Sequence, residues 1–259
     1  MATSDSEAEI TKVKTIDEQL GELPRGLSPF YDPLLRHEVN ESLESGGEVF
    51  LSQDPSGVTD GLFIYDGFEA TGTIFTRSRD VFERFYRIKP SSYIFSELEV
   101  AEYPHEAWNI WQLDVDNASS EYRFRYNVSI CHEAAEIERF MAVAEPETNK
   151  RWVSVALANG DKCFVVKIAG RIVGIAWMTI VGDVARSHGL FVAPRFRKLG
   201  MSRDNFQARL IYLKSRGVHT LINEISESNV ASHRLASSEG EKVVGKIYLY
   251  ESPKGKEPS

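Results

Sequence analysis

The sequence predicts an α+β protein made of two successive mixed α/β blocks. Its 259 residues exceed the roughly 150 of a typical domain, which favours one large domain or two smaller ones. Hydrophobic residues make up 42% and charged residues 26%, a composition typical of globular proteins. Strand patterns and helix patterns alternate along the whole chain, and a polar stretch at 114–120 separates them into two groups.

The first block is expected at residues 28–118, behind an acidic arm at 1–27 that we expect to be weakly docked. Apolar runs on either side of the turn at Asp54–Gly57 predict a hairpin, and Gly46–Gly47 ends a helix pattern. The expected elements are a helix at 33–44, strands at 48–52, 61–65 and 68–76, a helix at 79–88, an extended segment at 92–100 and a helical or irregular segment at 105–113.

The second block is expected at residues 119–251, before a polar tail at 252–259. Apolar residues at i, i+4 and i+7, ending at Gly217, predict an amphipathic helix at 202–216. The other expected elements are strands at 122–130, 162–168, 171–181, 185–192, 219–225 and 242–250, and helices at 132–143, 149–157 and 229–237.

Charge and cysteine content exclude several classes of protein. With 30 basic and 38 acidic residues the net charge is −8, so no overall field attracts nucleic acid or anionic lipid. No apolar run is long enough to span a bilayer, and the polar N-terminus is not a secretory signal. Cys131 and Cys163 are too few for a disulfide framework, and the histidines show no metal-ligand spacing. We expect a soluble, cytoplasmic protein without a metal, a nucleic-acid partner or a membrane partner.

A basic loop lies between the strand at 185–192 and the helix at 202–216. The stretch Arg195–Arg203 contains several bases and no acid. A helix N-terminus presents unpaired amides and the positive end of the helix dipole, so it binds phosphate readily. Gly200 permits close approach of the backbone. By itself this pattern leaves a solvated basic turn equally open.

The residues around the loop resemble the acyl-CoA loop of the GNAT superfamily of N-acyltransferases. The family pattern is Arg or Gln, two residues, Gly, one residue, then Gly or Ala, and this chain reads Arg197-Lys-Leu-Gly200-Met-Ser202. The stretch Leu221–Gly240 is similar to the family's next strand and helix, L-x-x-E-V-x-x-x-N-x-x-A-x-x-L-Y-x-x-x-G-F. The resemblance covers roughly residues 122–251.

The resemblance implies a GNAT-like mixed sheet in which the strands near 186–192 and 220–225 separate and admit the pantetheine arm of acetyl-CoA, the expected cosubstrate. Asn229 is equally well explained as a helix cap. The cofactor-binding residues implied are Leu190, Phe191, Val192, Arg197, Lys198, Leu199, Gly200, Met201, Ser202, Asn229 and Ser232.

Acyl transfer to nitrogen needs a deprotonated amine, a polarised thioester carbonyl and an acid for the leaving thiolate. Glu224 stands where many family members place a carboxylate, and His188 lies just before the expected acyl pocket. Either would serve as general base through a water molecule, although Glu224 is equally suited to pairing with a nearby base and His188 to a structural role. The family's usual tyrosine acid is Ala236 in this chain, and Tyr248 is the candidate substitute.

The function expected is an acyl-CoA-dependent N-acetyltransferase that moves the acetyl group directly to a primary amine. The sequence does not select the acceptor or the oligomeric state. Two alternatives stay open: a catalytically weak CoA-binding sensor or interaction module, and a scaffold whose basic loop binds no cofactor. The first block is compatible with a degenerate second copy of the GNAT fold, because it has a similar strand and helix pattern without the loop motif.

Overall fold

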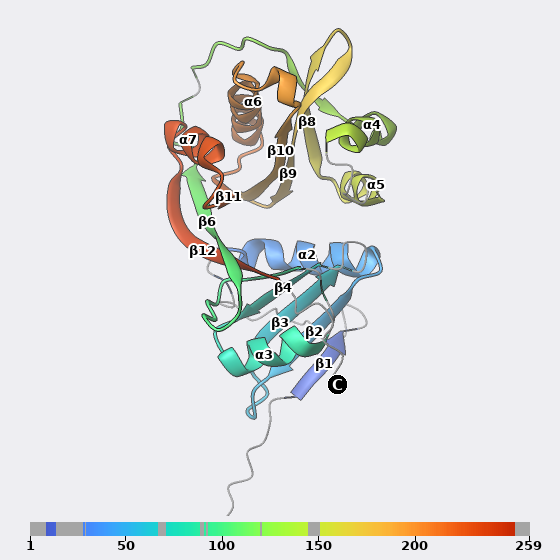
Figure 1. The fold of residues 1–259 in the computed structure, drawn as a ribbon, viewed down its shortest axis with the longest axis vertical. Helices are drawn as coiled ribbons and strands as arrows, with labels where there is room; N and C mark the ends of the chain where they lie inside the picture. The colour runs from blue at the N-terminus through green and yellow to red at the C-terminus, as the bar shows by residue number, and fades with distance from the viewer. Residues whose placement is uncertain are drawn as a thin grey trace, which may run out of the picture. The chain divides into compact units, whose positions relative to one another are not determined.

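The structure is a computed structural model that describes residues 9–13, 28, 30–66, 71–88, 91, 93–119, 121–144 and 151–251. The chain divides into two compact units, each with its own strands and helices (Figure 1). The first unit combines Met1–Trp108 with Lys246–Ser259, and the second is Asn109–Gly245. The division expected from the sequence, 28–118 and 119–251, therefore misses that the end of the chain returns to the first unit.

The first unit is a sheet with helices on both faces. Its strands are ordered β1-β2-β3-β4-β5-β12. Only β4 and β5 are parallel, because α3 crosses over between them. Figure 1 shows α2 on one face of this sheet and α3 on the other. The elements are β1 (Glu9–Val13), α2 (Asp32–Glu44), β2 (Glu48–Gln53), β3 (Thr59–Asp66), β4 (Thr71–Thr76), α3 (Arg79–Ile88), β5 (Tyr93–Ser96) and β12 (Lys242–Glu251).

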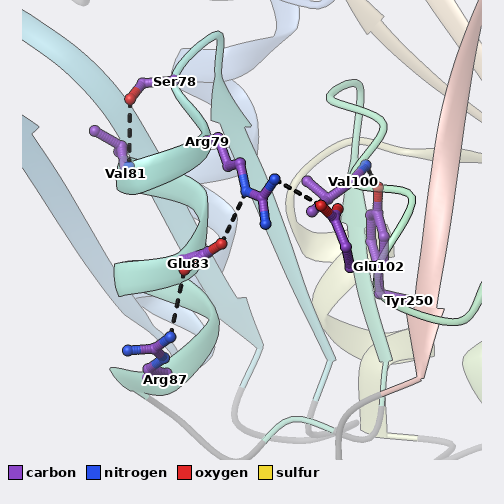
Figure 2. Close-up of polar contacts among 8 residues, drawn as sticks. All are labelled: Ser78, Arg79, Val81, Glu83, Arg87, Val100, Glu102 and Tyr250. Carbon is purple, nitrogen blue, oxygen red and sulfur yellow. Dashed lines mark hydrogen bonds and ion pairs between the residues drawn. The ribbon is translucent and has the colours of Figure 1, made fainter.

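Helix α3 has one aromatic face and one charged face. Its buried residues, Val81, Phe82, Phe85 and Tyr86, recur at helical spacing and pack in one core cluster with Phe50, Phe63 and Ile74. On the exposed side, Figure 2 shows Arg79 donating from Nε to Glu83 (3.0 Å) and from Nη1 to Glu102 (2.7 Å). The core therefore lies between α3 and the sheet.

Strand β12 completes the first unit. Tyr250 is fully buried, and its ring centroid lies 5.0 Å from that of Phe82. Its hydroxyl accepts a hydrogen bond from the amide of Val100 (2.8 Å, Figure 2) and donates to the carbonyl of Leu98 (2.6 Å). Strand β12 is thus held by packing and by two hydrogen bonds of the Tyr250 hydroxyl.

The second unit is a sheet ordered β6-β11-β10-β9-β8-β7. Strands β10 and β11 pair in parallel and are connected by α6, whereas β9 pairs antiparallel with β10 and with β8, and β8 pairs antiparallel with β7. Helices α4 and α5 pack in one core cluster with Trp177, and α6 packs in another with Met178, the next residue on the strand, so the helices cover opposite faces. The elements are β6 (His105–Asp114), β7 (Val128–Cys131), α4 (Ala134–Ala144), α5 (Arg151–Ala158), β8 (Lys162–Ile168), β9 (Arg171–Val181), β10 (Val184–Val192), a 3-10 turn η1 (Pro194–Phe196), α6 (Met201–Ser215), β11 (Thr220–Ser226) and α7 (Val230–Ser238).

The structure corrects the sequence interpretation in two segments, one on each side of the predicted boundary between the two blocks. Residues 105–113 were expected to be helical or irregular and form strand β6. Ile110 and Trp111 are consecutive and both buried, so the strand is covered on both faces and shows no alternating pattern. The strand expected at 122–130 is only Val128–Cys131, because the side chain of Asp204 takes the amides of Arg125 and Tyr126 away from strand pairing.

The other expected helices and strands are present within a few residues of their predicted ends. In the arm expected at 1–27, residues 9–13 form strand β1, which pairs with β2. The rest of that arm and the tail at 252–259 lie outside the described residues. Within the described part of the chain, no helix is both long and apolar enough to cross a membrane.

Candidate functional site

The central feature of the second unit is the separation of β10 and β11. The two strands pair from Val184–Thr220 to Ser187–Asn223 and no further. Beyond this point β10 bulges against β9, where Gly189 has a φ of +58° and a Cβ would lie 3.0 Å from the ring of Trp177. We call the separated residues, 188–192 and 224–226, the fork. The separation implied by the family resemblance is present.

The loop after β10 leaves its backbone amides open. Lys198 and Gly200 have positive φ values of 65° and 92°, and Gly200 caps α6 without any side-chain hydrogen bond. The described residues provide no acceptor for the amides of residues 198–202, which we call the amide cradle. These amides sit at the positive end of a helix dipole, an arrangement suited to phosphate.

Leu190 and Val192 of the fork line one pocket of about 270 Å³ together with the amide cradle. Its lining includes most of the residues expected from the sequence to hold the cofactor. They are Leu190, Val192, Arg197, Lys198, Gly200, Met201, Ser202 and Ser232, joined by Phe196, Arg203, Ala231 and Leu235.

Three expected cofactor residues lie outside this lining. Phe191 packs edge-on against Phe140 of α4, and Leu199 is exposed. Asn229 is the N-cap of α7, where its side chain accepts a hydrogen bond from the amide of Ser232 (3.2 Å). The capping interpretation of Asn229 is therefore present in the structure.

The corresponding helix start in the first unit is closed. Strand β4 ends at Thr76 and α3 begins at Arg79, so no extended loop separates them. Ser78 accepts a hydrogen bond from the amide of Val81 (3.4 Å, Figure 2), and its own amide donates to Thr76 (3.0 Å). Local side chains satisfy these donors, which leaves less of this helix end for an anion.

Two residues that the sequence analysis missed shape the loop. Asp204 is fully buried and accepts from the hydroxyl of Tyr122 (2.6 Å) and from the amides of Arg125 (3.0 Å) and Tyr126 (2.7 Å). These contacts hold Arg125 beside the loop, where its Nη1 would lie 3.6 Å from a Cβ on Gly200. Burial and the Asp204 bond raise the pKa of Tyr122 to about 12. The only sequence signal for the contacts of Asp204 is that it is an acidic residue in the first turn of α6.

The two candidate bases are the first residues beyond the last pair. Because strand side chains alternate, His188 and Glu224 share the face opposite Ser187 and Asn223. Glu224 is 8% exposed and accepts from Nε of Arg186 (3.0 Å), so the expected pairing with a nearby base is present.

His188 is more accessible, with 30% of its side chain exposed. Its Nε2 lies 3.6 Å from Oδ2 of the buried Asp161 and 3.4 Å from Oγ1 of Thr179. Asp161 follows α5 and was not predicted. It places a buried carboxylate beside the imidazole.

Tyr248 and Ala236 belong to different units. Tyr248 lies in the first unit, where its hydroxyl donates to Oε2 of Glu99 (2.9 Å). Ala236 is buried on α7 with Trp111 and Ile225. In the described residues no group of three His, Cys, Asp or Glu side chains is placed to hold a metal ion.

A comparison with protein families matches residues 124–253, half of the chain, to the acetyltransferase (GNAT) family. The chain belongs to the GNAT acetyltransferase family. The matched region begins beside Arg125 and includes the fork and the amide cradle. The family assignment made from the loop motif is therefore confirmed.

Solved structures show the same fold. A Drosophila protein is similar over 89% of this chain and 93% of its own, with 10% identity and a TM-score of 0.66. A tandem GNAT protein from the clavulanic acid biosynthesis pathway is similar over 96% and 100%, with 12% identity and a TM-score of 0.62. A GCN5-related N-acetyltransferase from Sphaerobacter thermophilus is similar over 78% and 79%, with 14% identity and a TM-score of 0.58. No curated protein sequence matches the chain.

At these identities the likeness shows the fold alone. It confirms the expected GNAT fold class, and the tandem GNAT protein matches both units of this chain. That the first unit is a degenerate copy stays a prediction, which the closed start of α3 supports.

Proposed function

We propose that the second unit of this GNAT protein transfers the acetyl group of acetyl-CoA directly to a primary amine. The observation that carries the proposal is the pocket lined by the β10 side of the fork and by the amide cradle. A thioester with a pantetheine arm and a pyrophosphate needs an open strand edge and an anion site, and this pocket offers both.

The residues present fit such a cofactor. Among the described residues, no acceptor is found for the amides of residues 198–202, and these amides suit a pyrophosphate. Lys198 and Arg125 add positive charge beside them, and the backbone at Leu190 and Val192 borders the same pocket for the pantetheine arm. Arg197 instead braces the loop, since its Nε donates to the carbonyl of Val192 (3.0 Å).

We assign the general base to His188. Acetyl-CoA supplies an activated acyl group as its thioester. His188 takes a proton from the acceptor amine, through water, and Asp161 stabilises the resulting imidazolium. Glu224 is the less suitable base, because protonating it would break its ion pair with Arg186. Tyr248, the acid expected from the sequence, belongs to the first unit and donates its hydroxyl to Glu99, so its role as acid for the leaving thiolate rests on the sequence alone.

Direct transfer is supported by the state of both cysteines. Cys131 and Cys163 are buried, and burial raises the pKa of each thiol. A neutral buried thiol is a poor nucleophile, so no acyl-enzyme step is included.

Thermal unfolding with acetyl-CoA, free CoA and ATP tests the cofactor assignment. A ligand at about 100 times its dissociation constant adds roughly 2.7 kcal/mol to native stability, which gives a measurable rise in Tm. We expect a rise with both CoA species and none with ATP. A scaffold whose loop binds no cofactor gives no rise with any of them.

An acetylation assay with a panel of amines then separates the enzyme from a CoA sensor. The sensor is favoured by one feature, the alanine at position 236 where the family usually has a tyrosine acid. Binding of CoA without acetylation of any amine would support the sensor. Turnover that survives Tyr248→Phe unchanged would remove Tyr248 from the mechanism.

A further inference from the structure

A buried arginine lies behind the last pair of the parallel ladder. Arg209 projects from α6 and is 2% exposed, and its Nη1 donates a hydrogen bond to Oγ of Ser187 on β10. Burial lowers the pKa of Arg209 to about 10, with Glu241 acting in the opposite direction as a counter-charge. One side of the last pair is therefore tied to helix α6.

A buried carboxylate ties down the other side. Glu241 precedes β12 and is 4% exposed, and its Oε2 accepts from Nδ2 of Asn223 on β11 (2.7 Å). Burial raises the pKa of Glu241 to about 7, against the lowering effects of Asn223 and Arg209. Glu239, at the end of α7, also raises it and is itself paired with Arg203 of α6.

The arrangement is costly for a purely structural contact. Nε of Arg209 and Oε1 of Glu241 are buried and have no hydrogen-bond partner in the described structure. Buried charges with unsatisfied atoms contribute less to stability than well-packed apolar residues of the same size. The two groups nevertheless meet the side chains of Ser187 and Asn223, the pair after which the strands separate.

We propose that Arg209 and Glu241 are positioning residues that fix the point at which β10 and β11 separate, so that acyl-CoA affinity depends on the charge of Glu241. This proposal rests on the proposed function. An ionised Glu241 makes a charge-assisted bond to Asn223 and balances Arg209, which holds the strands firmly. A protonated Glu241 makes only a neutral bond, and the fork is held less firmly.

The test measures the dissociation constant of acetyl-CoA by titration calorimetry between pH 6 and pH 8.5. Glu241→Gln keeps an acceptor for Asn223 but removes the charge, whereas Glu241→Leu removes both. We expect the wild-type dissociation constant to fall about three- to tenfold as pH rises, and the glutamine variant to show none of that change. Leucine should weaken binding about tenfold at every pH, with partial rescue by glutamine.

Two features of the design isolate Glu241. Titration of the cofactor phosphate is common to all variants, so it cancels in the comparison. Glu136→Gln is the matched control, because this carboxylate pairs with Lys167 on β8 instead (2.7 Å) and should leave the pH dependence intact. Ser187→Ala removes only the acceptor of Arg209 and should weaken binding at least threefold; it replaces the leucine variant if that one does not fold.

The outcomes separate this inference from the proposed function. Wild-type protein that binds acetyl-CoA, together with a glutamine variant that keeps the full pH dependence, overturns the inference and leaves the function standing. Unchanged affinity in both Glu241→Leu and Ser187→Ala, with only a loss of Tm, assigns the network a purely structural role. Wild-type protein that binds no acetyl-CoA at any pH overturns both proposals.

Discussion

Ser187 on β10 and Asn223 on β11 form the last pair of their parallel ladder, and their side chains face α6 while those of the next residues, His188 and Glu224, lie on the opposite face. Neighbouring residues of these two strands therefore have different roles on the two faces of the sheet. Buried polar contacts hold the strands together on one face, and groups able to move protons lie on the other. The backbone beyond this pair is left open along the pocket.

Replacing Gly200 tests the amide cradle. A leucine at φ +92° strains the backbone by about 1–2 kcal/mol and puts a side chain at the start of α6. We expect Gly200→Leu to weaken acetyl-CoA binding by at least tenfold, as measured by calorimetry. Gly217→Leu is the control, since that glycine lies just beyond the other end of the same helix, at φ +69° with open space around it.

The two variants should lose similar stability, so any difference in affinity belongs to the loop. Equal affinity in Gly200→Leu and Gly217→Leu would contradict the assignment of residues 198–202 as the anion site.

Arg125 provides a second test of the same site. Because it lies beside Gly200, Arg125→Gln should raise the dissociation constant of acetyl-CoA about three- to tenfold, in keeping with the loss of one charged contact. The effect should shrink at high salt. Arg123→Gln removes another exposed charge two residues away and should change affinity by less than twofold. An equal effect of both substitutions would indicate only a general loss of charge.

The amide cradle could be predicted from the sequence, because its pattern is local. A run of bases, a glycine and the start of a helix lie within ten residues of one another. The geometry of a helix N-terminus then presents open backbone amides at this point. Arg125 and Asp161 could not, since each reaches the site through contacts distant in sequence, to Asp204 and to His188. The hydrophobic periodicity of a sequence does not indicate contacts between residues so far apart in the chain.

The sequence pattern also does not show that β12 belongs to the first unit. Its alternating pattern predicts a strand but names no neighbour, and its partner β5 lies some 150 residues earlier in the chain. The burial of Tyr250 among aromatic side chains of α3 decides the pairing, and this is a property of the assembled core.

The assignment of His188 predicts a specific pattern of kinetics. His188→Gln should lower kcat about 100-fold or more, the usual contribution of a general base, with little change in acetyl-CoA affinity. Glu224→Gln should lower kcat less, since its carboxylate is engaged by Arg186. The reverse order of effects would transfer the role of base to Glu224.

The buried hydrogen bond of Tyr250 should contribute to the stability of the first unit. Tyr250→Phe leaves the buried amide of Val100 without its acceptor, which should cost about 1–3 kcal/mol of unfolding free energy. Hydrogen exchange of α3 amides measures this loss locally. Tyr248→Phe is the matched control, because its hydroxyl bonds an exposed carboxylate and its loss should cost well under 1 kcal/mol. Acetyl-CoA affinity should be unchanged in Tyr250→Phe.

Titration of Glu241 should make the stability of the second unit depend on pH. Its pKa is raised in the folded protein from 4.5 to about 7, so the native state binds the proton more tightly than the unfolded state. Stability should therefore fall as pH rises from about 4.5 to 7, by an amount on the order of 3 kcal/mol. Glu241→Gln cannot titrate, and hydrogen exchange of α6 amides should show this decline in wild type but not in the variant. The charge that holds Asn223 would thus be kept at a cost in stability, and an equal decline in both proteins would show that Glu241 is not its source.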